Sequence, residues 1–459
     1  MKTKYNIIVC ILVTAVAALV SCSPVSKLRQ PDLQDMPQTF AKGEADSTTI
    51  ADLTKWQFYA DTTLTSLIER ALDRNRDVAI AAAHMRELEK LYGVDKLNYL
   101  PDLNANFGAL RETNHYYGQA FKPDTEVSLK ATLSWEADLW GGLSWKQKQS
   151  KEKFLGAAEE YRAMQMTIVS QVATAYINLV ALDSELAVVR NAVETRAESL
   201  EKAKLRYEGG LTSEVVYQQA LVEYSTAAAM IPNLENRITM AENALNILTG
   251  DFPGREILRH NVSLDLNLPE RVPVGVPSMM LEKRPDIRAA EHNLKAAAAA
   301  VGVAYANRFP SFRISLTGGA ENEQLAHLLE SPFSYMLGNL AGTVFDWGKK
   351  KRAYEAKIEA YEQARLAYEQ RVMSAFAEVD NAISAYRSAL SAVERRTDLR
   401  DAASRYLQLA NLQYRGGSLN YLDVLDAQRR YLDSEIALTN SVRDEYLALV
   451  MLYRALGGW

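Results

Sequence analysis

The chain has 459 residues, of which 48% are hydrophobic and 24% are charged, an ordinary composition for a globular or helix-rich protein with a sizeable core. Its 52 basic and 57 acidic residues give a formal net charge of −5, and this weak acidity gives no support for a nucleic-acid partner, which usually requires a basic face. The sequence has no glycine-rich phosphate loop, and its five histidines show no ligand spacing, so we expect no catalytic residue, no metal site and no enzymatic activity.

Residues 1–21 are predicted to be a lipoprotein signal peptide. Lys2 and Lys4 form a basic start, and the apolar run that follows, residues 7–20, is too short for a typical membrane-spanning helix. The run ends in Leu-Val-Ser-Cys, which resembles the lipobox of bacterial lipoproteins, and this resemblance implies that Cys22 is acylated and becomes the first mature residue. The alternative is a plain signal peptide followed by an incidental cysteine.

Cys22 is the only cysteine of the expected mature chain, because Cys10 falls in the removed segment. We therefore expect no disulfide framework and no cofactor apart from the covalent lipid. In some lipoproteins an aspartate directly after the lipidated cysteine favours retention in the inner membrane. This chain has Ser23 at that position, so the outer membrane is favoured. Residues 22–63 are then a lipidated N-terminal arm, and the polar, proline-containing sequence of its first half indicates an irregular chain.

The first helical pattern starts at Leu64 and breaks near Asn75. It resumes from Asp77, which is well placed as a cap or as an acid of the first turn, and continues to about Leu97. Pro101 prevents the helix from continuing further.

Two segments with period-two alternation follow. Apolar and polar side chains alternate over residues 103–109 and, more cleanly, over residues 127–135, with a polar loop between them at residues 115–124. Alternating runs of about ten residues flanked by aromatic side chains are typical of membrane β-barrel strands. A soluble hairpin packed on a core would show the same alternation, so both interpretations stay open here.

A helical pattern without proline runs over about residues 145–207, and at 1.5 Å per residue it predicts a rod of roughly 90 Å that neighbouring helices must cover. Gly209-Gly210 then predicts a tight tip, because glycine takes positive φ without a Cβ penalty. A return helix follows over about residues 213–248, and Pro232 is expected to kink it or to mark a join.

The same order of elements occurs twice. After a proline-rich connector, residues 251–283, the pattern of repeat 1, residues 64–250, returns as repeat 2, residues 284–459. A second tip, Gly416-Gly417, lies 207 positions after the first, and the prolines that end the first helix of each repeat are 209 positions apart. Register held over such a span indicates a tandem duplication in which the second strand hairpin is two residues shorter.

Each repeat supplies two strands, so one chain supplies four. A sheet that crosses a bilayer has to close, and four strands cannot enclose a lumen, so we expect three chains to share a 12-stranded β-barrel. The same homotrimer would bring the long helices together in an α-helical barrel that continues the β-barrel. The predicted fold class is therefore an α+β membrane protein of two tandem repeats, with outer-membrane lipid around the barrel and the lipid on Cys22 as a second anchor.

Five motifs carry a resemblance to a known family. They are Leu-Pro-x-Leu at 100–103, Ser-Trp-Glu-Ala-Asp-Leu-Trp-Gly at 134–141, Arg-Pro-Asp-Ile at 284–287, Phe-Asp-Trp-Gly at 345–348 and Tyr-Leu-Asp-Val-Leu-Asp-Ala at 421–427. Together they resemble the outer-membrane efflux protein family, the TolC-like exit ducts, and in particular its lipoprotein branch of OprM-type channels. The resemblance implies a trimeric duct that spans the outer membrane and the periplasm. It also implies that the duct docks on a periplasmic adaptor (membrane fusion) protein, which an inner-membrane pump of RND type feeds.

The resemblance also implies a periplasmic gate. Asp423 and Asp426, three residues apart on the helix after the second tip, match its acidic pair, and Tyr414 matches another gate position. Three-fold symmetry would stack the carboxylates in two rings whose negative potential favours cations. Some members carry an arginine at the position of Leu419, and this arginine bonds to the acids. Whether a salt bridge closes the gate of this chain is therefore an open question. The structural alternative is a solvated helix face.

The two tips match the segments with which the family meets its adaptor. These segments are Gly209, Gly210, Leu211, Thr212, Gly416, Gly417, Ser418 and Leu419. Exposed leucine at both tips favours contact with a partner. The alternative is a plain helical turn, which needs no partner.

We therefore expect an outer-membrane exit duct of a tripartite efflux system, which passively conducts small molecules such as drugs and toxic compounds. Export of protein or polysaccharide is the alternative among ducts. A lipid-anchored periplasmic coiled-coil scaffold without a pore is the alternative of another class, but it has no use for alternating strands bounded by aromatic residues.

Overall fold

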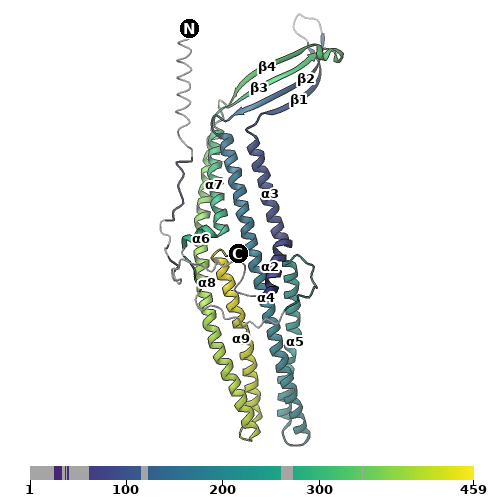
Figure 1. The fold of residues 1–459 in the computed structure, drawn as a ribbon, viewed down its shortest axis with the longest axis vertical. Coiled ribbons are helices and arrows are strands. Elements are labelled where there is room, and N and C mark those ends of the chain that lie inside the picture. The colour runs from purple at the N-terminus through teal and green to yellow at the C-terminus, as the bar shows by residue number, and fades with distance from the viewer. Residues whose placement is uncertain are drawn as a thin grey trace. The chain divides into compact units, whose positions relative to one another are not determined.

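The computed structural model describes residues 25–33, 37, 39–40, 61–114, 122–259, 272–275, 277–343 and 345–458 (Figure 1). The expected signal peptide, Cys22 and most of the N-terminal arm lie outside these ranges. The chain forms two compact units, each built from both halves of the sequence. The first comprises residues 1–33, 84–158 and 289–370, and the second comprises residues 34–83, 159–288 and 371–459.

The first unit contains a four-stranded antiparallel sheet in the order β1-β2-β3-β4 (Figure 1). The strands are β1, Asp102–Asn114; β2, Lys122–Ala137; β3, Ser311–Asn322; and β4, Pro332–Ala341. A short 3-10 helix, η3, Leu325–Glu330, lies between β3 and β4. In the described part of the chain, β1 and β4 each pair on one side only, so the sheet is open at both edges.

One face of this sheet is apolar and exposed. A row of apolar side chains crosses all four strands in register: Leu103, Leu133, Leu316 and Met336. Leu103 and Met336 on the edge strands are 71% and 75% exposed. A soluble hairpin would bury this face against a core, whereas hydrocarbon covers it without loss, so the exposed face favours the membrane interpretation.

The described part of the chain contains eight α-helices. They are α2, Thr62–Arg74; α3, Arg76–Leu97; α4, Gly142–Glu208; α5, Glu214–Leu248; α6, Pro277–Lys283; α7, Pro285–Ala306; α8, Lys349–Arg415; and α9, Tyr421–Ala455. Helices α4 and α8 have 67 residues each, α5 and α9 have 35 each, and α3 and α7 have 22 each. The two tandem repeats of the predicted fold class are confirmed.

The duplication extends to single hydrogen bonds in the second unit. In repeat 1, Asn75 Nδ2 donates to the carbonyl oxygen of Leu248 at 2.9 Å. In repeat 2, Arg284 Nη1 donates to the carbonyl oxygen of Ala455, also at 2.9 Å. The donors are 209 positions apart and the acceptors 207. Each repeat thus ties the end of its return helix, α5 or α9, to the residue that directly precedes α3 or α7.

Asn75, and not Asp77, caps α3. Asn75 Oδ1 accepts the backbone N–H groups of Asp77 at 2.9 Å and Val78 at 3.3 Å, so it satisfies two free donors of the first turn. Asp77 lies in that first turn, which confirms the second of its two predicted roles. Its negative charge there interacts favourably with the helix dipole.

Two short helices were not predicted, and one strand differs from its predicted position. Helix α6 interrupts the proline-rich connector, because Pro277 occupies a first helical position, where its missing N–H costs nothing. The strand-like pattern in the sequence of repeat 2 runs over residues 337–345, whereas strand β4 covers Pro332–Ala341 and is thus displaced towards the N-terminus. Helix α5 runs through Pro232, so the proline does not mark a join between two helices, and a kink at this position stays a prediction.

Helix α4 contains an 18-residue window with a mean hydropathy of 1.5, apolar enough by length and composition to cross a membrane. However, 61% of that window is buried inside the structure. Residues such as Ile168, Val172 and Leu179 are at most 1% exposed. This part of α4 therefore belongs to the buried core of the protein.

The described part of the N-terminal arm packs against helices of the first unit. Leu28 is buried in a cluster with Leu294, Val301 and Tyr361, from α7 and α8. Tyr361 Oη donates to the carbonyl oxygen of Arg29 at 2.8 Å. The arm is therefore fixed to the helices a few residues after Cys22.

Candidate functional site

Both predicted tips are helix ends closed by the same backbone motif. The second glycine of each pair takes positive φ, +70° at Gly210 and +76° at Gly417. The following N–H reaches back five residues, from Leu211 to the carbonyl oxygen of Arg206 at 2.7 Å, and the equivalent bond from Ser418 is 3.0 Å. These bonds form a Schellman motif, which satisfies carbonyls that the helix end leaves free.

The tips differ in how the return helix begins. Asn420 caps α9, because its side chain accepts the N–H of Leu422 at 3.4 Å. Ser213 precedes α5 without a side-chain cap. Ser418 Oγ donates to the carbonyl oxygen of Gln413 at 3.1 Å, so it stabilises the end of α8 instead.

Only one of the two tip leucines is exposed. Leu211 is 73% exposed. Leu419 is half-buried against Val424, in a cluster with Ala410 and Ala427, so the prediction of exposed leucine at both tips is wrong for repeat 2. Leu419 precedes the cap Asn420, and packing against the fourth residue of the new helix is a hydrophobic staple.

Tyr414 links the two halves of the tip region. Arg206 Nη1 of α4 donates to Tyr414 Oη of α8 at 2.9 Å, and the guanidinium lies 5.6 Å from the ring centroid. Tyr414 also packs on Tyr421, with ring centroids 5.3 Å apart. Sequence reasoning missed Arg206, since no local spacing relates two residues 208 positions apart.

Asp423 and Asp426 have different surroundings. Asp426 accepts Arg429 Nη2 and Arg430 Nε, each at 2.6 Å. Its hydrogen bond with Arg430, followed by the charges of Arg430 and Arg429, holds the pKa of Asp426 below its usual value. Asp423 lies in the first turn of α9 and forms no ion pair with another described residue. The two arginines could have been found at i+3 and i+4 from Asp426.

The charge balance at the predicted gate residues therefore differs from the prediction of two equal acidic rings. Asp426, Arg429 and Arg430 together carry a net charge of +1 at neutral pH. Asp423 is the uncompensated carboxylate, in a first turn that the helix dipole favours for an acid. A cavity of about 490 Å³ lies between the tips, lined by residues that include Lys202, Arg206, Thr212 and Tyr414.

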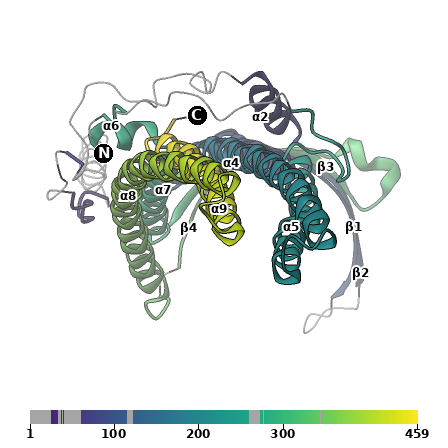
Figure 2. The same ribbon diagram turned by 90° about the horizontal axis from the view of Figure 1, so that it is seen from below.

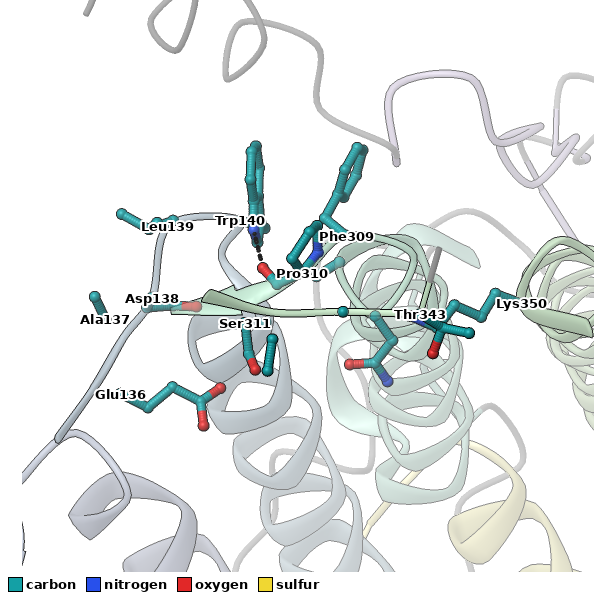
Figure 3. Close-up of a pocket in the computed structure, with 15 residues that line it drawn as sticks. Glu136, Ala137, Asp138, Leu139, Trp140, Phe309, Pro310, Ser311, Thr343 and Lys350 are labelled. Atoms are coloured by element: carbon teal, nitrogen blue, oxygen red, sulfur yellow. Dashed lines mark hydrogen bonds between the residues drawn. The ribbon is translucent and has the colours of Figure 1, made fainter. Parts of the chain in front are cut away.

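A second cavity, of about 400 Å³, lies in the first unit where the strands end and the helices begin (Figure 3). Trp140 Nε1 donates to the carbonyl oxygen of Pro310 at 2.7 Å, and its ring stacks on Phe309 at 4.7 Å. Asp138 accepts the N–H groups of Leu143 and Ser144, both at 2.9 Å, and so caps α4. This region fixes the direction in which the helices leave the sheet.

Seen from below, α5 lies beside α4 and α9 beside α8 (Figure 2).

Among the described residues, no cluster of histidine, cysteine, aspartate or glutamate is arranged to hold a metal ion.

Comparison with known proteins places the chain among efflux proteins. The family model of outer membrane efflux proteins matches residues 67–251 and 276–458. The solvent efflux pump outer membrane protein SrpC of Pseudomonas putida is 29% identical over 409 residues, 88% of this chain and 86% of its own length.

Two solved structures are similar over nearly the whole chain. A membrane protein from Pseudomonas aeruginosa is 27% identical with a TM-score of 0.87, over 95% of this chain and 100% of that chain. The open state of the MtrE outer membrane channel of Neisseria gonorrhoeae is 26% identical with a TM-score of 0.85, over 95% and 98%.

Proposed function

We infer the role of this chain from the premise that it belongs to the outer membrane efflux protein family. The protein is an outer-membrane exit duct of an efflux system, and it forms a trimer. The observation that carries this role is the open sheet with its exposed apolar face. Its two unpaired edges would leave backbone groups unsatisfied in hydrocarbon, and three chains with twelve strands close the sheet around a water-filled lumen.

We further propose that the duct conducts small molecules passively and catalyses no reaction. The relative SrpC is named a solvent efflux protein, which supports a small, apolar or amphipathic substrate class. Export of protein or polysaccharide remains the second candidate. A scaffold without a pore would gain nothing from an exposed apolar sheet.

We propose that both tips, residues 209–212 and 416–419, meet a periplasmic adaptor protein that connects the duct to an inner-membrane pump of RND type. Exposed Leu211 supports an apolar contact at the first tip. At the second tip Leu419 is used internally, so the exposed backbone and polar groups of residues 416–418 would form that contact.

We propose that Cys22 carries the lipid and is the only modified cysteine. The lipobox-like sequence Leu-Val-Ser-Cys that ends at Cys22 supports this. Intact-mass measurement is expected to show a lipid-sized addition that Cys22→Ser abolishes. An unmodified Cys22 in the mature protein would leave the plain signal peptide as the correct interpretation.

The gate proposal is tested by single-channel conductance in planar bilayers. Asp423→Asn is expected to raise the conductance and lower the cation preference several-fold, because it removes the uncompensated charge. Asp426→Asn leaves Arg429 and Arg430 unbalanced, so it is expected to shift the preference towards anions. Glu214→Gln, the first-turn acid of α5, is the matched control and should change neither quantity.

The outcomes separate the hypotheses. An open pore that ignores both aspartate substitutions keeps the duct and moves the gate elsewhere. Folded trimers that never conduct, in wild type and variants alike, would favour the scaffold.

A further inference from the structure

The sheet curls towards the face opposite to its apolar one, which we call the polar face. Side chains crowd together there: Thr317 and Ser128 are 4% and 7% exposed, and the hydroxyl oxygens of Thr132 and Thr317 lie 3.0 Å apart. On the apolar face, Leu103 and Met336 are largely exposed. A barrel that closes with this curvature has the polar face inside, as a water-filled lumen requires.

Two aromatic side chains lie on this polar face, near the end of the sheet that is opposite to the start of α4 and α8 (Figure 1). Phe333 of β4 lies opposite Gly319, and Tyr335 lies opposite Thr317. The ring centroids of Phe333 and Tyr335 are 6.1 Å apart, the rings are inclined by only 11°, and Tyr335 is 51% exposed. A stacked aromatic pair on a face that water covers presents an apolar surface to whatever passes through the lumen.

The hairpin does not require this aromatic pair for its fold. The two hairpins pair in the same register, and each residue of β4 follows its equivalent in β2 by 207 positions. The equivalents of Phe333 and Tyr335 are therefore Glu126 and Ser128. Repeat 1 forms its hairpin with polar groups at the same two places, so a role in binding explains the two rings better than a role in folding.

A lysine reaches across the sheet to the aromatic pair. Gly319 lies between Lys130 of β2 and Phe333 in one row, and it has no side chain to separate them. The ammonium nitrogen Nζ of Lys130 lies 5.7 Å from the ring centroid of Phe333, which is a cation–π distance. The same nitrogen lies 3.2 Å from a carboxylate oxygen of Glu126 and 3.2 Å from one of Glu321. Phe333 thus has a cation at its ring, and two acids hold that cation there.

The charges around the ring favour a cation over an anion. Glu126 and Glu321 carry two negative charges at neutral pH and Lys130 carries one positive charge, so the cluster has a net charge of −1. The carboxylate side chains are 45% and 48% exposed, so a cation in the lumen can reach them. An anion would meet two carboxylates and an ammonium group that they already neutralise.

We propose that Phe333, Tyr335, Glu126 and Glu321 form a binding site for aromatic organic cations on the lumenal face of the sheet. The rings of such a cation stack on the aromatic pair, and its positive charge takes the place of the Lys130 ammonium between the carboxylates. Three-fold symmetry places three copies of the site around the lumen. The proposal rests on the duct of the proposed function and adds a chemical class of substrate and the place where it is held.

Block of single-channel current tests the site in trimers reconstituted into planar bilayers. The probe is tetraphenylphosphonium, an aromatic cation, which is expected to interrupt the current of the wild type reversibly. Tetraphenylborate has nearly the same shape and the opposite charge, and it is expected to need a several-fold higher concentration for the same block. Phe333→Leu/Tyr335→Leu is expected to raise the half-blocking concentration of tetraphenylphosphonium about tenfold, because it removes both rings.

Two charge variants are expected to change the block in opposite directions. Lys130→Met removes the competing ammonium and leaves both carboxylates, so it should lower the half-blocking concentration of tetraphenylphosphonium several-fold. Glu321→Gln leaves the cluster without net charge, so it should raise that concentration several-fold. Weaker block in Lys130→Met would overturn the exchange of the lysine for a bound cation.

Ser334→Ala/Met336→Leu is the matched control, because these two side chains belong to the same strand and lie on the apolar face. It should leave the block unchanged. A block that the loss of both rings does not weaken, or one of equal strength for the two probe ions, would overturn the site and leave the duct in place. Folded trimers that carry no current without any probe would overturn the proposed function itself.

Discussion

Replacing Arg284 with methionine is expected to lower the free energy of unfolding by about 3–5 kcal/mol. Arg284 is 2% exposed, and it donates to Asp286 at 2.8 and 3.1 Å, to Glu378, and to the carbonyl oxygen of Ala455 at 2.9 Å. Methionine fills a similar volume without charge or donors. Asp286 and Glu378 would then share the single guanidinium of Arg371, and the end of α9 would lose its link to α7.

Urea unfolding of the purified trimer, followed by circular dichroism, measures this loss. Arg371→Met is the matched control; its side chain is 31% exposed, so water compensates more of the change. The double variant Arg284→Met/Glu378→Gln removes one charge of each sign and should recover part of the stability. If all three variants unfold at the urea concentration at which the wild type unfolds, the stability of the protein does not depend on charge pairing in this cluster.

The same cluster makes stability depend on acid. Burial raises the pKa of Asp286, but hydrogen bonds and charges from Arg284 and Arg371 outweigh it and lower the pKa to about 2. A carboxyl group with a lower pKa in the folded state stabilises the fold above its unfolded pKa of about 3.9 and loses this effect as the pH falls to the folded value. The wild type is expected to lose about 2 kcal/mol between about pH 4 and pH 2. Arg284→Met should flatten this decline.

Alanine at Gly302 is expected to destabilise the protein by about 1–3 kcal/mol, whereas alanine at Gly93 is expected to stabilise it by up to about 1 kcal/mol. The two glycines are 209 positions apart, in equivalent places of α7 and α3. A Cβ on Gly302 would lie 2.3 Å from the indole Cδ2 of Trp145, but one on Gly93 would meet no atom within 4 Å. The indole is rigid, so α7 and α4 would have to separate.

Thermal unfolding of the two variants under one condition compares them directly. Gly302→Ala/Trp145→Phe should recover part of the loss, because the smaller ring leaves room for the methyl group. The equivalent of Trp145 in repeat 2 is Arg352, whose flexible side chain can yield to a methyl group on Gly93 of a neighbouring subunit. Equal effects at both glycines would show that helix propensity, and not packing, determines the change in stability.

Most of the fold could be predicted because its signals are local and occur twice. Long proline-free patterns predicted α4 and α8, and the Gly-Gly pairs predicted both tips. Helix α6 and the start of β4 could not be found in this way. A seven-residue helix has little periodicity, and the bounds of β4 are set by its pairing with β3, which no local pattern records.

The charges around the predicted gate residues could not be predicted from the sequence. The family resemblance pointed to Asp423, Asp426 and Tyr414, but the partners of these residues come from packing. Arg206 reaches Tyr414 from another helix, and the arginines that follow Asp426 could equally have pointed to solvent. Leu419 was predicted to be exposed because a tip is exposed on average, and the staple that buries it depends on the side-chain direction of Val424.

The matched lengths of the four long helices restrict how this protein can evolve. One residue added to α4 alone would advance its end by about 1.5 Å and rotate all later side chains by about 100°, away from their partners on α5. A viable lengthening needs compensating insertions in α5 as well, and in α8 and α9 if the two tips are to stay level. Relatives should therefore accumulate insertions and deletions in the connections between strands, while the spacing between helix caps and tip glycines drifts very slowly.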